Sequence, residues 1–195
     1  MAGALYTALA LGEMTKGGIR MAGVWEGFDS GPCVSTSSNP PENWYTPSLF
    51  EAIAGGTNPA CPSIVQPPIG TAFPRASAIN VVQHAFNAGD TVFAPSVSAT
   101  DSLSAVRVYG ARRGSGYGLL LVNTGSEWVA TAVILGNDSR KFTAISLSYG
   151  WAQYISSVNN DWPGPVSQSL GTVSGSFMLQ VSPSSITAIT LSATP

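Results

Sequence analysis

Three residues near the start of the chain have side chains that could contact a sugar. Trp25 and Glu26 follow directly after the apolar run from Ile19 to Val24, and Asp29 comes three residues later. An indole ring offers an apolar face and a polar N–H. Carboxylates can hydrogen-bond hydroxyl groups, or act as acid, base or nucleophile in glycoside hydrolysis. The pattern therefore raises the question of whether Glu26 is a catalytic carboxylate.

The composition is that of a nearly neutral, hydroxyl-rich protein. Of the 195 residues only 9% are charged, against roughly 25% in an average soluble protein, and the net charge is −2. Such a surface has no electrostatic attraction for nucleic acid or an anionic membrane. The longest apolar runs, such as Leu119 to Val122, are too short to cross a bilayer. We expect neither nucleic acid nor a membrane as a partner.

The first part of the chain predicts a helix, a strand, a long loop and a second helix. A helix is expected over 2–16, because Leu5, Ala8, Leu9 and Gly12 recur at helical spacing. Gly17 and Gly18 follow and are a natural helix end. The apolar run predicts a strand over 19–25, and a loop rich in proline follows over 27–72. The second helix is expected over 74–87, with Pro74 in its first turn and Ile79, Val82 and Phe86 as its apolar stripe.

From Asp90 onward the pattern is that of short strands. Segments rich in β-forming residues alternate with turn signals, at 91–98, 104–112, 117–123, 128–135, 142–149, 176–181 and 186–192. Alternation of apolar and polar residues in several of them favours an antiparallel β-sandwich over 90–195. The continuous apolar run at 119–122 predicts a central strand covered on both faces.

The strand expected at 19–25 needs partners that this chain does not supply. A single buried strand between two helices is part of a βα unit, so residues 1–89 are interpreted as the end of a larger α/β domain. The fold class we expect is mainly β, with an antiparallel sandwich at the C-terminus and an incomplete α/β portion before it.

This order of elements resembles the C-terminal part of clan A glycoside hydrolases. Those enzymes are retaining and have a (β/α)8 barrel followed by a β-sandwich, and the arabinofuranosidase-, xylosidase- and endoglucanase-like members are the most similar. Residues 4–14 resemble their seventh barrel helix, and residues 18–25 resemble the eighth strand, which commonly ends in Trp. The ending at 181–191 is similar to their last sandwich hairpin. The resemblance implies that residues 1–89 are the remnant of such a barrel.

The resemblance also answers the question about Glu26. In the family the two catalytic carboxylates lie at the ends of the fourth and seventh strands. Only one loop and one helix separate Glu26 from the expected sandwich, so the strand at 19–25 matches the eighth strand. Both catalytic carboxylates would then lie upstream of this chain. We expect no catalytic residue here and no activity from the chain alone.

Sugar contacts are what the resemblance implies for the remaining candidates. Trp25 would stack on a sugar at the barrel mouth, while Glu26 and Asp29 would bind hydroxyl groups or support the catalytic pair. A packed indole and two solvated acids are the alternative. Trp44 and Tyr45, in the long loop, could form an outer subsite or simply pack the loop. Carbohydrate and the remainder of the barrel are the expected partners.

Cysteine and histidine usage limits other chemistry. Cys33 and Cys61 lie in one loop and could form a disulfide worth roughly 3–4 kcal/mol on the chain-entropy model, or stay unrelated thiols. A lone histidine, His84, gives no basis for a metal site, and we expect no metal and no other cofactor. The composition and the resemblance together suggest a secreted or periplasmic protein, although no signal peptide is recognised in this sequence.

Two functions from different classes remain open. One is a fragment of a glycoside hydrolase that acts on plant-type or microbial polysaccharide or oligosaccharide. The other is a non-catalytic β-sandwich, either carbohydrate-binding or structural. An exposed aromatic strip on a sheet face would favour the second function, and its candidate residues are Trp128, Trp151, Tyr154 and Trp162. A sheet face packed against residues 2–16 and 74–87 would favour the first.

Overall fold

The computed structural model describes residues 1–19, 28–29, 50–51, 56–58, 61–66, 74–96, 105–156 and 163–194. The helices are α1 (Ala2–Lys16), α2 (Pro74–Ala85) and α3 (Trp151–Ser156). Four short strands come first, inside the segment that the sequence predicts as a loop over 27–72, so that prediction is wrong for these residues: β1 (Phe28–Asp29), β2 (Phe50–Glu51), β3 (Gly56–Asn58) and β4 (Cys61–Gln66). The others are β5 (Thr91–Phe93), β6 (Val106–Arg113), β7 (Gly116–Asn123), β8 (Val129–Ile134), β9 (Phe142–Gly150), β10 (Val166–Val173), β11 (Ser176–Val181) and β12 (Ser185–Ala193). Beyond Ile19, the strand expected at 19–25 lies outside the described residues.

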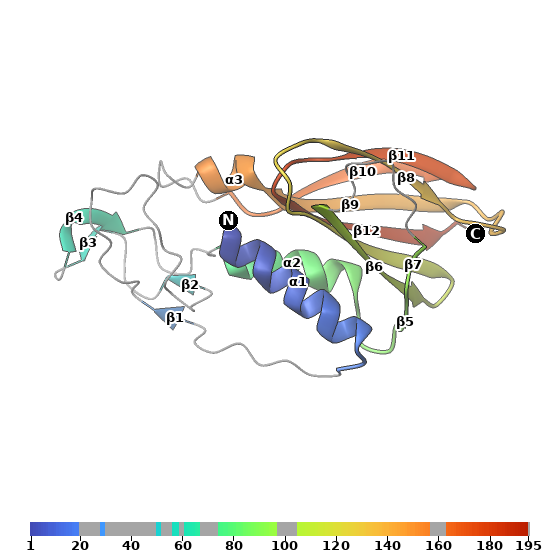
Figure 1. The fold of residues 1–195 in the computed structure, drawn as a ribbon, viewed down its shortest axis with the longest axis horizontal. Helices are drawn as coiled ribbons and strands as arrows, with labels where there is room; N and C mark the ends of the chain where they lie inside the picture. The colour runs from blue at the N-terminus through green and yellow to red at the C-terminus, as the bar shows by residue number, and fades with distance from the viewer. Residues whose placement is uncertain are drawn as a thin grey trace.

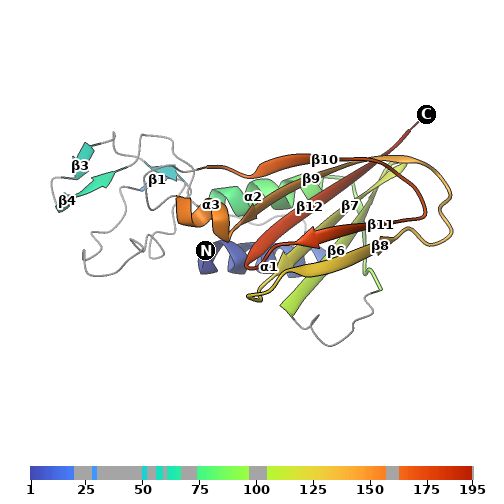
Figure 2. The same cartoon turned by 90° about the horizontal axis from the view of Figure 1, so that it is seen from above.

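The main element of the fold is a six-stranded antiparallel sheet with the order β10-β9-β12-β7-β6-β5. Strands β8 and β11 pair only with each other and form a separate two-stranded antiparallel ribbon. Helices α1 and α2 lie side by side along one face of the six-stranded sheet, and the ribbon lies over the opposite face (Figures 1 and 2). The prediction of a mainly β, antiparallel fold with a small helical part is confirmed.

Strand β7 shows why both faces of the sheet are buried. Leu120 and Val122 point into the core that the sheet shares with the helices. Leu119 and Leu121 point into the second core, which the sheet shares with the ribbon. Because successive side chains of a strand alternate between faces, a central strand covered on both sides must be continuously apolar. The prediction made from residues 119–122 is confirmed.

Helix α1 begins and ends where the sequence predicts. Gly18 has φ +78°, and the N–H groups of Gly18 and Ile19 donate to the carbonyls of Thr15 and Met14. These two bonds form a Schellman motif, which satisfies the last carbonyls of the helix and requires a left-handed residue that glycine adopts without strain. The buried side of α1 consists of small residues, Ala4, Ala8 and Gly12, so the helix approaches its neighbours closely.

Helix α2 forms as expected from Pro74 onward, and Val82 is buried as predicted, but the rest of its buried stripe differs from the prediction. The residues in the core are Ala78, Val81, Val82 and Ala85, at i, i+3, i+4 and i+7 spacing. The predicted stripe residues Ile79 and Phe86 are only partly buried. The small side chains at the contact allow α2 to lie directly on β7, where a Cβ added to Gly118 would clash with the carbonyl oxygen of Ala85.

The β region differs from the sequence prediction at three elements. Strand β10 and helix α3 are not predicted from the sequence, and β5 ends at Phe93 instead of continuing through Pro95. The core formed by α1, α2 and the sheet includes residues from both sides of the boundary placed at 89/90. The division into two domains at that point stays a prediction. No described helix is long and apolar enough to cross a membrane.

Candidate functional site

Most of the sugar-contact residues predicted from the sequence fall outside the described residues. This applies to Trp25, Glu26, Trp44 and Tyr45. The backbone of Asp29 is described, as the end of β1, and its register partner in the parallel pairing with β2 is Glu51. The structure therefore does not show these five candidates as one site, and their roles stay predictions.

The predicted disulfide between Cys33 and Cys61 also stays a prediction. Cys61 is the first residue of β4, where it is the register partner of Asn58, while Cys33 lies outside the described residues. Among the residues whose side chains are described, no three His, Cys, Asp or Glu side chains gather closely enough to hold a metal ion.

The described polar groups instead attach the helices and turns to the sheet. At the C-terminal part of α1, the hydroxyl of Tyr109 on β6 donates a 3.0 Å hydrogen bond to Glu13 Oε1. Lys16 Nζ lies 3.7 Å from the other carboxylate oxygen of Glu13. Burial, together with the hydrogen bond to Glu13, raises the pKa of Tyr109 to about 12. The phenol is therefore neutral and serves as a fixed donor between sheet and helix.

A second group of contacts holds the end of α2. Asp90 Oδ2 accepts from the backbone N–H of Asn87 at 2.8 Å and from Arg113 Nε at 3.1 Å. The carbonyl of His84, in the last turn, accepts from Thr190 Oγ1 at 3.1 Å. Burial and the neighbouring Arg113 charge both lower the pKa of His84. The contacts of Asp90 and of the His84 carbonyl join α2 to β6 and β12. Nε2 of the His84 imidazole is buried and has no hydrogen-bond partner among the described residues.

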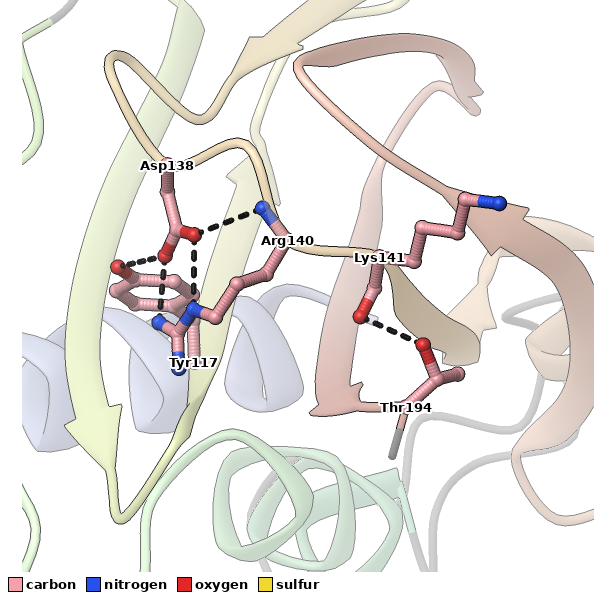
Figure 3. A network of polar contacts seen from close by, with 5 residues as sticks. All are labelled: Tyr117, Asp138, Arg140, Lys141 and Thr194. Carbon is pink, nitrogen blue, oxygen red and sulfur yellow. Dashed lines mark hydrogen bonds and ion pairs between the residues drawn. The ribbon is translucent and has the colours of Figure 1, made fainter.

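A third group of contacts holds the turn that connects β8 to β9 (Figure 3). Arg140 donates to both carboxylate oxygens of Asp138, from Nε at 2.8 Å and from Nη2 at 2.6 Å, and the Tyr117 hydroxyl adds a 2.8 Å bond. The guanidinium also lies 5.2 Å from the ring centroid of Phe142. The Arg140 contacts first, and the Tyr117 hydroxyl second, hold the pKa of Asp138 well below its usual range. This carboxylate is therefore ionised at neutral pH, where it anchors the turn and has no proton to donate.

Asn123 provides the fourth group, at the opposite end of β7. Its buried amide Nδ2 donates to the carbonyls of Glu127 and Ser182, each at 2.9 Å, and its Oδ1 accepts from the N–H of Gly125 at 2.9 Å. The turn after β7 and the turn before β12 are thereby held together. Sequence reasoning missed all four groups. Each joins residues that are distant in sequence or hidden in a turn, and no local pattern marks them.

These four groups of contacts therefore have a structural role: they hold the helices and turns on the sheet. Glu13, Asp90 and Asp138 come from three separate elements, and each is bonded to a different cation. A retaining glycosidase needs two carboxylates about 5–5.5 Å apart, one of them able to donate a proton. The three acids are instead committed to holding helices and turns in place.

Comparison with known proteins gives a similarity of fold. No protein-family model and no curated protein matches the sequence. In structure the chain is similar to a GH30 endoxylanase from Clostridium papyrosolvens, with a TM-score of 0.50 and 18% sequence identity over 64% of this chain and 29% of that chain. The predicted resemblance of fold to a glycoside hydrolase is confirmed.

Two further structures give weaker similarities. The catalytic domain of a GH30 xylanase C from Talaromyces cellulolyticus has a TM-score of 0.46 and 13% identity, over 75% of this chain and 27% of that chain. CelM2, a bifunctional glucanase-xylanase from a metagenome library, has a TM-score of 0.41 and 18% identity, over 66% of this chain and 24% of that chain. The chain spans less than a third of the length of each of these proteins.

Proposed function

We propose that this chain is the C-terminal part of a retaining glycoside hydrolase that acts on plant-type or microbial polysaccharide or oligosaccharide. Both catalytic carboxylates lie upstream of Met1 in this proposal. The domain division is the one predicted from the sequence, with a barrel remnant at 1–89 and a β domain at 90–195. The proposed location is secreted or periplasmic, where Cys33 and Cys61 could be oxidised.

The observation that carries the proposal is the packing of α1 and α2 on the sheet. Ala4, Ala8, Val81 and Ala85 from the helices form one core with residues of the sheet such as Leu120. A free-standing carbohydrate-binding sandwich needs no pair of helices on one face. A β domain attached to a barrel needs such helices, because the helices of the barrel's outer ring are the elements that it can contact.

The incomplete burial of the apolar side chains of α1 supports the same proposal. Leu5, Leu9 and Leu11 flank the core and are only partly buried, and Tyr6 is 72% exposed. A helix that is apolar on most sides is normally surrounded by other elements. In the proposed enzyme further elements of the barrel, upstream in sequence, would cover these side chains. Trp25, Glu26 and Asp29 would then contact sugar at the barrel mouth, with Trp44 and Tyr45 as an outer subsite.

Hydrolysis assays on the purified chain test the first part of the proposal. The chain alone should release no aglycone from aryl glycosides and no reducing ends from xylan or β-glucan, because acid and nucleophile are absent from it. Turnover by the chain alone that is abolished by Glu26→Gln would show that Glu26 is catalytic and would overturn the proposal. Glu13→Gln serves as the matched control, since that carboxylate is occupied by Tyr109 and Lys16.

A further inference from the structure

The outward-facing side of the β8–β11 ribbon carries an exposed row of uncharged side chains. Its members alternate with the residues that face the sheet, and we call this row the ribbon face. It consists of Trp128, which precedes β8, Ala130, Ala132 and Ile134 of β8, and Ser176, Met178 and Gln180 of β11. The three large side chains are strongly exposed: Trp128 64%, Met178 65% and Ile134 74%. Exposed apolar groups that gather on one face indicate a binding surface more than scattered ones do.

The backbone that carries Trp128 is held in place. Asn123, fully buried, donates to the carbonyl of Glu127, the residue directly before Trp128. The same amide donates to the carbonyl of Ser182, and the N–H of Ser184 donates to the carbonyl of Gly125 at 2.9 Å. A fixed backbone lowers the part of the ordering entropy that comes from the main chain, so a ligand that contacts the indole has only the side chain to order.

The shape of the ribbon face suits a thin, extended ligand. In the strand register Ala130 lies opposite Gln180, Ala132 opposite Met178, and Ile134 opposite Ser176. The middle of β8 therefore presents only the methyl groups of Ala130 and Ala132, and the indole of Trp128 lies at one end of the strand. Six residue steps separate Trp128 from Ile134, which gives a track about 20 Å long. A protein partner would be expected to interdigitate with larger side chains at the centre of its interface.

The charge of the ribbon face narrows the class of ligand. None of its seven side chains is ionisable, and Gln180 and Ser176 supply neutral donors and acceptors. A neutral polymer with alternating apolar ring faces and hydroxyl groups is complementary to such a surface. An anionic polymer would gain no ion pair from these seven side chains.

We propose that the ribbon face binds a neutral polysaccharide, with the indole of Trp128 stacked on a sugar ring and the amide of Gln180 bonded to its hydroxyl groups. This binding belongs to the described chain itself. It requires neither the upstream carboxylates nor the predicted contacts of Trp25. It would hold the polymer on the side of the sheet opposite α1 and α2.

Affinity electrophoresis in gels containing soluble xylan, xyloglucan or mixed-linkage β-glucan tests the proposal. At least one of these polymers should retard the wild-type chain, and Trp128→Ala should weaken the binding roughly tenfold or more. Gln180→Ala should weaken it less. Trp151→Ala is the control, because Trp151 is 46% exposed but belongs to α3 and is not one of the seven residues of the ribbon face. Thermal unfolding of each variant should match the wild type, since these side chains are exposed.

Several outcomes would overturn the proposal. These are no retardation by any of the three polymers, equal retardation of Trp128→Ala and wild type, or equal retardation in gels of anionic polygalacturonate. A dimer that Trp128→Ala converts to monomer in light scattering would assign the face to a second copy of the chain instead. Because binding is measured without hydrolysis, its failure is distinct from failure of the proposed catalytic arrangement.

Discussion

Gly12 of α1 and Tyr109 of β6 are in direct contact, so closely that a Cβ added to Gly12 would lie 2.6 Å from the ring atom Cε2 of Tyr109. Real Cβ atoms do not approach a ring atom this closely, so the absence of a side chain at Gly12 sets the distance between helix and sheet. The residue next to it, Glu13, receives the hydroxyl hydrogen bond of the same tyrosine. Helix α1 is thus held to the sheet by one steric and one polar contact with a single residue.

Gly12→Ala should destabilise the chain by about 1–3 kcal/mol, because the added methyl group must displace the Tyr109 ring or the helix. Gly3→Ala in the same helix is the control. Its Cβ would lie 3.4 Å from the flexible side chain of Arg75, and alanine has the higher helix propensity, so stability should rise by up to about 1 kcal/mol. Urea unfolding of both variants measures the difference. Equal effects of the two substitutions would contradict the close contact at Tyr109.

The raised pKa of Tyr109, about 12, predicts a stability that depends on alkaline pH. Between the ordinary tyrosine pKa of about 10 and this value, the unfolded chain loses the proton while the folded chain keeps it. The stabilising contribution of Tyr109 is therefore fully present below about pH 10 and is lost as the pH rises through about 12. Tyr109→Phe should flatten the pH dependence of the urea midpoint in this window. A pH dependence identical to that of the wild type would show that the phenol titrates normally.

The contacts of Asp138 predict a stabilising contribution to the free energy of unfolding that is lost in acid instead of in alkali. Arg140 and Tyr117 lower the pKa of Asp138, so its contribution is present above the ordinary carboxyl pKa and is lost as the pH falls below it. Asp138→Asn should make the chain less stable at neutral pH and reduce the loss of stability on acidification. Lys141→Ala is the control, because its side chain points away from this network (Figure 3). Equal acid sensitivity of Asp138→Asn and wild type would contradict the lowered pKa.

Asn123→Ala should cost about 2–3 kcal/mol, because the carbonyls of Glu127 and Ser182 would lose their donor inside the protein. Asn137→Ala, at an exposed turn position, should change stability by no more than about 0.5 kcal/mol. Thermal unfolding measures both effects. If Asn123→Ala also weakens polysaccharide binding by the ribbon face, the turn acts as the support of Trp128.

The sequence predicts those elements whose signals are local. The Schellman glycine Gly18 and the helix-starting Pro74 each mark an element boundary within a few residues, and the run at 119–122 marks the central strand. Strand β10 has no such signal. It is an edge strand in which Ser and Gln are exposed on both faces, so its pairing with β9 comes from the backbone and not from an apolar pattern.

The contacts between distant segments could not be predicted from a single sequence. Tyr109 and Glu13 are 96 positions apart, and Thr190 reaches the carbonyl of His84 across 106 positions. Which stripe of α2 is buried also depends on the partner, since the close approach to β7 selects Ala78 and Ala85 over Ile79 and Phe86. Of the predicted sugar-contact residues, only the backbone of Asp29 lies in the described part of the chain.

The most direct test of the proposed function is to locate the nucleophile in a longer protein that includes the coding sequence upstream of Met1. An activated 2-deoxy-2-fluoro glycoside should trap a covalent glycosyl-enzyme, since a retaining enzyme forms this intermediate. Peptide mass spectrometry then identifies the labelled carboxylate. We expect a single label, on a residue upstream of this chain. A label on Glu26 or Asp29, or hydrolysis with inversion and no covalent adduct, would contradict it.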